Sequence, residues 1–356
     1  MNKSMVLSAF MLLAPYSESY ADEYVPISKP MYMSLPAHGA PERATSHAAK
    51  LPTWNTVYTY NGTKYSDAML GANPAKSNVT TTILVYIIPI KLVYGADNGN
   101  MVFDPAKHVL PNGNTVVGDL IASPLFSSGV DFIQDGTNLG ATQYIDAFQR
   151  GNFWTAVRKN PNYHILLGDP KVLSEQTIKV TQAQGKVTTE FGANVGTMDI
   201  NDFDAMAQRY IAKFSKINPG VLPLFVTYDA YLTSGGDCCI GGYHSATDAS
   251  QTYVYSTYID VPGAFSQDVS GFSHELGEWM DNAFANNNTP CGSLDVGVGS
   301  DGEANYGDFP YVLNGSTYNL QDLAFMSYFG APRSRSLHGW FSFQDNQSLG
   351  VCSNAP

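Results

Sequence analysis

The chain has 356 residues, of which 44% are hydrophobic and only 14% are charged, and its formal net charge is −12. This length and hydrophobic fraction allow a large buried core. Binding to a nucleic-acid backbone needs a positive surface, and the sequence has no basic run, so we do not expect nucleic acid as a partner.

The N-terminal residues 1–21 have the pattern of a secretory signal peptide. Lys3 supplies the positive end, Met5–Pro15 the short apolar run, and Ser19-Tyr20-Ala21 a small-x-small cleavage site. The sequence therefore predicts a secreted or periplasmic protein. No later stretch reaches the roughly 18 apolar residues of a membrane span, so we expect no stable membrane anchor after cleavage.

Residues 22–75 are rich in Pro, Ser, Tyr and Ala, and they predict an irregular N-terminal arm. Residues 76–356 predict a single α+β domain with a mixed sheet, because strands and helices follow without a strict βαβ rhythm. β-branched and aromatic runs predict strands over 78–94, 164–167, 223–228 and 252–260. Apolar periodicity predicts helices over 119–132, 141–158, 201–214, 266–284 and 320–329, the third capped by Asp202 and the fourth by Asp268.

The four cysteines, Cys238, Cys239, Cys291 and Cys352, are expected to form disulfides that stabilise loops, because an even number in an exported chain favours them. A bond between adjacent cysteines needs a strained ring, so we expect bridges from Cys238 and Cys239 to Cys291 and Cys352. The alternative of thiolate metal ligands lacks the paired C-x-x-C spacing of structural zinc sites.

The segment His274-Glu275-Leu276-Gly277-Glu278 lies in the fourth predicted helix and carries the clearest chemistry. His274 and Glu278 are four residues apart and face the same way, and Asp281 continues that row. The pattern is that of the H-E-x-x-H metalloprotease helix with Glu278 in place of the second histidine. It predicts zinc binding by His274 and Glu278, with Glu275 as the catalytic general base. The alternative is a surface pair on a polar helix face.

The helix also resembles a family. Ser273–Asn282 is similar to the H-E-[LI]-[AG]-E-x-x-x-[DN] segment of secreted bacterial HExxE-motif proteins, which are distantly related to the plant exordium (phosphate-induced) proteins. Cys239–His244 resembles the Cys-x-x-Gly-Tyr-His element of that family, and Tyr318–Phe329 and His338–Phe341 are similar to its C-terminal elements. The resemblance covers roughly residues 140–345 and implies a zincin-like fold with a metallohydrolase site.

The resemblance further implies a third ligand downstream of Cys291, where Asp295 occupies the first acidic position of the family pattern. Val298 replaces the second, which leaves Asp301, Glu303 and Asp308 as alternatives. These four carboxylates could also form an irregular Ca²⁺ loop, since hard cations favour oxygen ligands.

His244 is a further alternative ligand or supporting residue. It follows Gly241-Gly242 in a Gly- and Cys-rich segment that we expect to be a loop. A lone histidine is more often a hydrogen-bonded structural residue.

Three functions follow from these patterns. The first is a secreted zinc hydrolase, peptidase-like, acting on a peptide or cell-envelope substrate. The second is a non-catalytic exported protein in which the metal is a structural staple. The third is a surface- or carbohydrate-binding module, suggested by the aromatic residues around Trp340-Phe341.

Overall fold

The structure is a computed structural model, and it describes residues 31–35, 50–60, 62–190, 192–247, 251–287, 303–325, 337 and 342–344. The predicted signal peptide lies outside the described residues. So do Cys291, Asp295, Asp301, His338 and Cys352.

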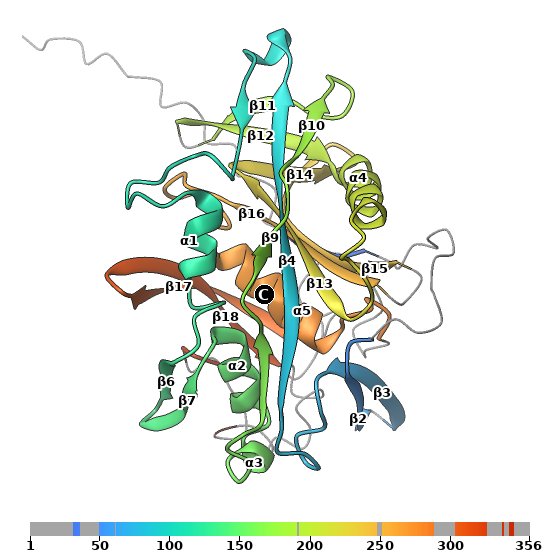
Figure 1. The fold of residues 1–356 in the computed structure, drawn as a ribbon, viewed down its shortest axis with the longest axis vertical. Coiled ribbons are helices and arrows are strands. Elements are labelled where there is room, and N and C mark those ends of the chain that lie inside the picture. Colours follow the sequence, from blue (N-terminus) through green and yellow to red (C-terminus); the bar gives the residue numbers. More distant parts are fainter. Residues whose placement is uncertain are drawn as a thin grey trace, which may run out of the picture.

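A curled, mixed sheet forms the body of the chain, and its longest strand, β4, runs along the vertical axis of Figure 1. Its main strands follow the order β10-β4-β13-β16-β15-β14-β12-β11. They span Gln176–Val180, Thr80–Tyr94, Val221–Tyr228, Gln251–Tyr258, Asp237–Thr247, Ala230–Ser234, Ala193–Asp199 and Val187–Glu190, respectively. Four shorter strands join it: β5 (Val102–Phe103), β8 (His164–Leu167) and β9 (Lys171–Val172) pair with β4, and β1 (Met31–Ser34) pairs with β15.

Both parallel and antiparallel ladders occur in this sheet, as the α+β prediction requires. β4, β13 and β16 run parallel, whereas β15 is antiparallel to β16 and to β14. Every residue of β13 and β16 is buried, which explains their β-branched and aromatic composition. The strands predicted over 78–94, 164–167, 223–228 and 252–260 are all present.

Outside the sheet are five helices and three hairpins among the described residues. The helices are α1 (Val116–Ala122), α2 (Tyr144–Asn152), α3 (Trp154–Val157), α4 (Ile200–Lys213) and α5 (Ser270–Asp281), with a short 3₁₀ turn η1 at Ala96–Asn98. The hairpins are β2–β3 (Thr53–Tyr60 and Thr63–Leu70), β6–β7 (Val130–Gln134 and Thr137–Thr142) and β17–β18 (Glu303–Leu313 and Ser316–Phe325).

Several predicted elements differ from the structure. The helix predicted over 320–329 is wrong for its described part, because residues 316–325 form β18, paired with β17. The helix predicted over 119–132 ends at Ala122, just before Ser123-Pro124, and β6 begins at Val130. The segment expected to be an irregular arm contains β1 and the β2–β3 hairpin.

Two predicted helix caps are also wrong. The N-cap of α4 is Asp199, whose side chain accepts hydrogen bonds from the backbone N–H groups of Asn201 and Asp202. The N-cap of α5 is Val269. Asp268 precedes it and accepts hydrogen bonds from Asn319 on β18.

The sheet separates α4 from α5, because side chains alternate across each strand. On the α4 side, Tyr243 and Tyr253 both donate hydrogen bonds to Asp204. On the α5 side, Trp279 donates to Thr252. Successive residues of β16, Thr252 and Tyr253, therefore contact the helices on opposite faces of the sheet. No helix in the described part of the chain is long and apolar enough to cross a membrane.

Candidate metal centre

Helix α5, drawn in orange near the centre of Figure 1, carries the His274–Glu278 segment and is buried along all of its twelve residues. One side packs on β15 and β16, the other on the β17–β18 hairpin, and α2 and β1 also contact it. A helix buried on every side normally has an apolar sequence. The surface-pair alternative for His274 and Glu278 is therefore wrong, and their polar groups must be satisfied inside the protein.

Three buried side chains converge between α5 and β15: His244, Glu275 and Glu278. Each offers one ligand atom, and these atoms all lie within 4.8 Å of one another. His244 Nδ1 is 3.4 Å from Glu275 Oε2 and 3.6 Å from Glu278 Oε2. His244 and Glu275 are fully buried, and Glu278 is 5% exposed.

These separations are longer than those of a short histidine–carboxylate hydrogen bond and are compatible with ligands around one ion. Charge-assisted N–H···O bonds are about 2.7–2.9 Å long. His164 and Asp146 in the same chain form such a bond, with Nδ1 2.7 Å from Oδ2. Two ligands that are each about 2.0–2.1 Å from a tetrahedral zinc ion lie roughly 3.3 Å apart. The His244 distances match the second case.

Gly242 makes room for this arrangement. It lies two residues before His244 on β15, so both positions face α5. A Cβ at Gly242 would lie 2.6 Å from Glu275 Cγ and 2.9 Å from its Oε1. Only glycine lets the Glu275 side chain lie against the strand, and Tyr243 between them points to Asp204 on the other face.

His274 joins the group through Glu278. Its Nε2 is 2.9 Å from Glu278 Oε1, so the Glu278 carboxylate contacts both histidines, one with each oxygen. The other ring nitrogen, Nδ1, is 2.8 Å from Gln321 Oε1 on β18. The Gln321 amide donates from Nε2 to the Tyr32 hydroxyl, which makes Oε1 the atom that faces His274. Nδ1 of His274 thus faces the Gln321 oxygen, and Nε2 faces the Glu278 carboxylate, the side from which it could reach an ion.

The other acidic residues predicted as ligands do not join the His244 group among the described residues. Asp281 is fully buried and accepts a hydrogen bond from Gln149 of α2, so it supports the helix rather than joining the group. Asp295 and Asp301 lie outside the described residues, and Glu303 begins β17.

Asp308 lies opposite Gln321 in the β17–β18 hairpin. Although the residue as a whole is exposed, desolvation raises the pKa of its carboxyl group. Hydrogen bonds with Ser270 and Gln321 and the nearby His274 imidazole act in the opposite direction. Asp308 is thus the one predicted alternative among these acids whose described side chain comes near His274.

The Gly- and Cys-rich segment before His244 is not a loop. Residues 237–247 form β15, which makes a hairpin with β14. Cys238 and Cys239 form a disulfide with each other, and the bridges predicted to Cys291 and Cys352 are wrong for this pair. The peptide bond between the two residues is cis, and their Cα atoms are 3.0 Å apart.

The pattern used to select ligands from the sequence missed part of the geometry. It used the four-residue spacing of His274 and Glu278, but Glu275 and Glu278 are three residues apart and also share a helix face. His244 is 31 residues before Glu275 along the chain. The sequence signal that could have indicated His244 was Gly241-Gly242-x-His244, which lies just before the strand-like segment that became β16.

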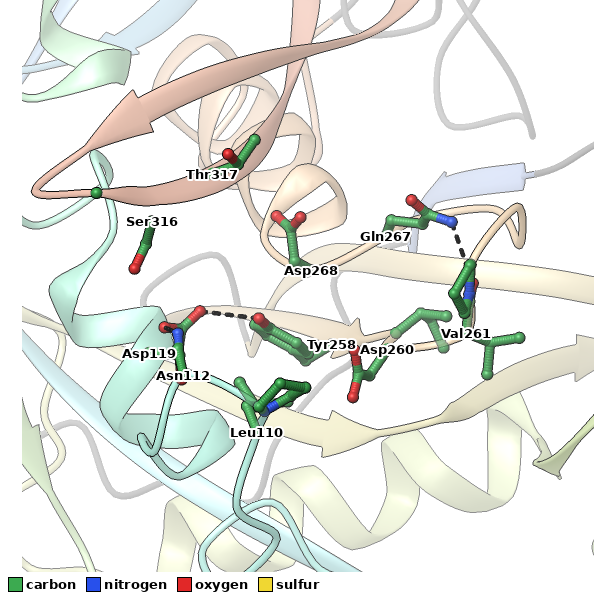
Figure 2. A pocket seen from close by; sticks show the side chains of 14 residues that line it. Leu110, Asn112, Asp119, Tyr258, Asp260, Val261, Gln267, Asp268, Ser316 and Thr317 are labelled. Atoms are coloured by element: carbon green, nitrogen blue, oxygen red, sulfur yellow. Dashed lines mark hydrogen bonds between the residues drawn. The ribbon is translucent and has the colours of Figure 1, made fainter.

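A separate pocket of about 400 Å³ lies at the N-terminal end of α5 (Figure 2). Its lining includes the carboxylates of Asp119, Asp260 and Asp268. Asp119 accepts a hydrogen bond from Tyr258, and Asp268 accepts hydrogen bonds from the backbone and side-chain amides of Asn319. Desolvation raises the pKa of Asp268 to about 7. Because Asp119 and Asp268 are occupied in holding neighbouring elements together, this pocket does not replace the His244 group as the candidate site.

No protein-family model, curated protein or solved structure matches this chain. The candidate function therefore rests on the side chains themselves.

Proposed function

We propose that this chain is an exported, zinc-dependent hydrolase with a zincin-like active site. The observation that supports this proposal is the buried group of His244, Glu275 and Glu278, whose donor atoms have the separations of metal ligands. Without a cation, two carboxylates would be buried close together, which is costly. A divalent ion between them removes that cost.

The donor set favours zinc over the calcium alternative. The group offers two imidazoles and two carboxylates once His274 is included through its contact with Glu278. Calcium takes six to eight oxygen ligands, whereas zinc takes nitrogen and oxygen in a four-coordinate arrangement. Imidazole nitrogens also bind zinc well.

The chain's own residues divide the chemical work in the following way. His244, Glu278 and His274 would hold the ion, and Gln321 orients the His274 ring so that Nε2 faces the group. Glu275 holds the proton taken from the attacking water, in the position of the general base of the H-E-x-x-H helix. When bound, the ion polarises the scissile carbonyl and lowers the pKa of water.

Glu275 can instead be a fourth ligand, since its Oε2 is as close to His244 as a ligand would be. The two roles differ in what a Glu275→Gln variant retains. If Glu275 is the base, the variant keeps about one zinc per chain and loses hydrolysis, since general-base catalysis contributes roughly 10²–10⁴-fold. If it is a ligand, the variant loses the metal.

The deciding experiment is elemental analysis of the full-length chain, purified without chelators, for wild type, His244→Ala, Glu278→Gln and the matched control His164→Ala. His164 is hydrogen-bonded to Asp146, and neither residue belongs to the group. We expect zinc in the wild type and the control and its loss from the other two. No metal in the wild type after zinc is supplied would overturn the proposal.

The burial of the group supports one second candidate, a structural metal staple in a non-catalytic protein. His244 and Glu275 are fully buried, and a catalytic ion needs an open coordination position. In that case chelation lowers the melting temperature, and no peptide or cell-envelope polymer is hydrolysed by the zinc-loaded chain. Hydrolysis that disappears in Glu275→Gln would exclude the staple.

A further inference from the structure

The short strand β1 borders the candidate metal centre. It pairs in parallel with β15, with Tyr32 beside Gly242 and Ser34 beside His244. The ladder continues as Leu35 donates its N–H to the His244 carbonyl at 3.1 Å, while Ser245 Oγ donates to the Leu35 carbonyl at 3.0 Å. The other edge of this part of β15 pairs with β16. β1 thus occupies the edge of the strand that carries His244.

Tyr32 brings an aromatic ring directly onto the centre. Its ring stacks on the His274 imidazole, with centroids 3.8 Å apart and planes 20° apart. Its hydroxyl accepts the Gln321 Nε2–H at 2.8 Å, and its ring edge meets Phe265. Tyr32 is only 7% exposed, and burial raises the pKa of its phenol.

An external peptide could pair with β15 in the same way as β1 does. β1 has four residues, and its pairing with β15 uses backbone groups that every polypeptide carries. An exposed strand edge is a template for another strand, and an aromatic anchor in a pocket adds specificity. β1 comes from a segment far from β15 in sequence, so its departure leaves the β15–β16 ladder intact.

We propose that the slot filled by β1 is the substrate groove of the centre, that its ligand is an extended polypeptide with an aromatic side chain at the position of Tyr32, and that β1 blocks this groove until it leaves. The inference rests on the proposed function, because it assigns a substrate class to the same site. It also accounts for part of the burial of the centre, because Tyr32 of β1 covers His274.

The test uses a fluorescent, end-blocked peptide with the sequence of residues 31–35, Met-Tyr-Met-Ser-Leu, and a control peptide with alanine in place of tyrosine. Binding to the full-length chain is compared among wild type, Tyr32→Ala, Tyr32→Phe and Tyr65→Ala. Tyr65 is a matched control, since it stacks on Tyr58 in the β2–β3 hairpin. We expect at least tenfold tighter binding of the tyrosine peptide to Tyr32→Ala than to wild type or Tyr65→Ala. Tyr32→Phe, which keeps the ring but loses the hydrogen bond to Gln321, should be intermediate.

Hydrogen exchange provides a second measurement that does not depend on the folding of a variant. In the wild-type chain, an excess of the tyrosine peptide should accelerate exchange of the Leu35 amide, because that amide loses its bond to His244 when β1 is displaced. Equal peptide affinity of all four chains, or an unchanged Leu35 amide at saturating peptide, would overturn the proposal.

The zinc content of the same samples separates this inference from the proposed function. A zinc-loaded chain in which the peptide fails to displace β1 contradicts the groove and leaves the metal centre standing. A chain that binds no zinc but exchanges β1 for the peptide contradicts the hydrolase and leaves the peptide slot standing.

Discussion

His244 on β15 and Glu275 on α5 are both fully buried, and His244 Nδ1 lies 3.4 Å from Glu275 Oε2. A histidine and a carboxylate that share only a proton approach more closely, as His164 and Asp146 do at 2.7 Å. At this separation the two side chains could be ligands of one ion together with Glu278. This relationship, rather than the helix motif alone, is the basis for the metal centre.

His244 should stabilise the fold when the metal is present. Removal of His244 leaves Glu275 and Glu278 buried without their common partner, so His244→Ala should lower the free energy of unfolding by about 3–5 kcal/mol. Chemical denaturation of His244→Ala, with and without zinc, measures this loss. Zinc should stabilise the wild type but not the variant, and equal stabilisation of both would contradict the assignment of His244 as a ligand.

Gly242 should tolerate no side chain. Gly242→Ala places a Cβ 2.6 Å from Glu275 Cγ and 3.0 Å from the Tyr255 carbonyl oxygen. The second contact is with the backbone of β16, which is paired with β15 and cannot easily shift. We expect a loss of about 1–3 kcal/mol in stability and weaker zinc binding.

The control for Gly242 is Gly118→Ala in α1. Its added Cβ would meet the Thr115 hydroxyl at 3.1 Å, and alanine favours a helix by about 1 kcal/mol. Thermal melting and zinc titration of both variants compare the two positions. If Gly242→Ala matches Gly118→Ala in both measurements, the close approach of Glu275 to β15 is not a constraint.

Gln321 should tune zinc affinity through His274. Gln321→Leu removes the acceptor for His274 Nδ1–H, and loss of such a partner typically lowers metal affinity 10–100-fold. Gln321→Glu keeps an acceptor at this position and should stay within a few-fold of wild type. Competition with a zinc chelator measures both affinities. Similar affinities for the Leu and Glu variants would show that the orientation of His274 does not depend on this bond.

Asp67 of β3 should make stability depend on pH. Its side chain is fully buried, and desolvation raises its pKa from 3.8 to about 6. The folded chain therefore holds this proton between those values while the unfolded chain does not. This contribution to stability is complete below pH 3.8 and is lost as the pH rises through about 6.

Asp67→Asn should remove that loss, which is on the order of 3 kcal/mol for a shift of this size. Urea denaturation across this pH range, with the exposed Asp169→Asn as control, compares the two profiles. A wild-type profile that keeps the same slope in Asp67→Asn would contradict the raised pKa of this carboxyl.

Local sequence was sufficient for the elements whose burial follows from their own composition. The β-branched run of β4, the strand at residues 164–167 and the periodicity of α4 and α5 were all predicted from neighbouring residues. The segment after residue 316 was not, because Leu320 and Leu323 have a helical spacing while pairing with β17 makes the segment a strand.

Local periodicity was enough to place His274, Glu275 and Glu278 on one helix, since it depends only on residues a turn apart. Tertiary packing brings His244 to the group, pairs Cys238 with Cys239 and places Tyr32 over His274. Residues far apart in sequence meet through strand register and the packing of α5 between sheet and hairpin. Strand register and helix packing depend on which surfaces of the whole chain become buried, and a pattern of neighbouring residues does not contain that information.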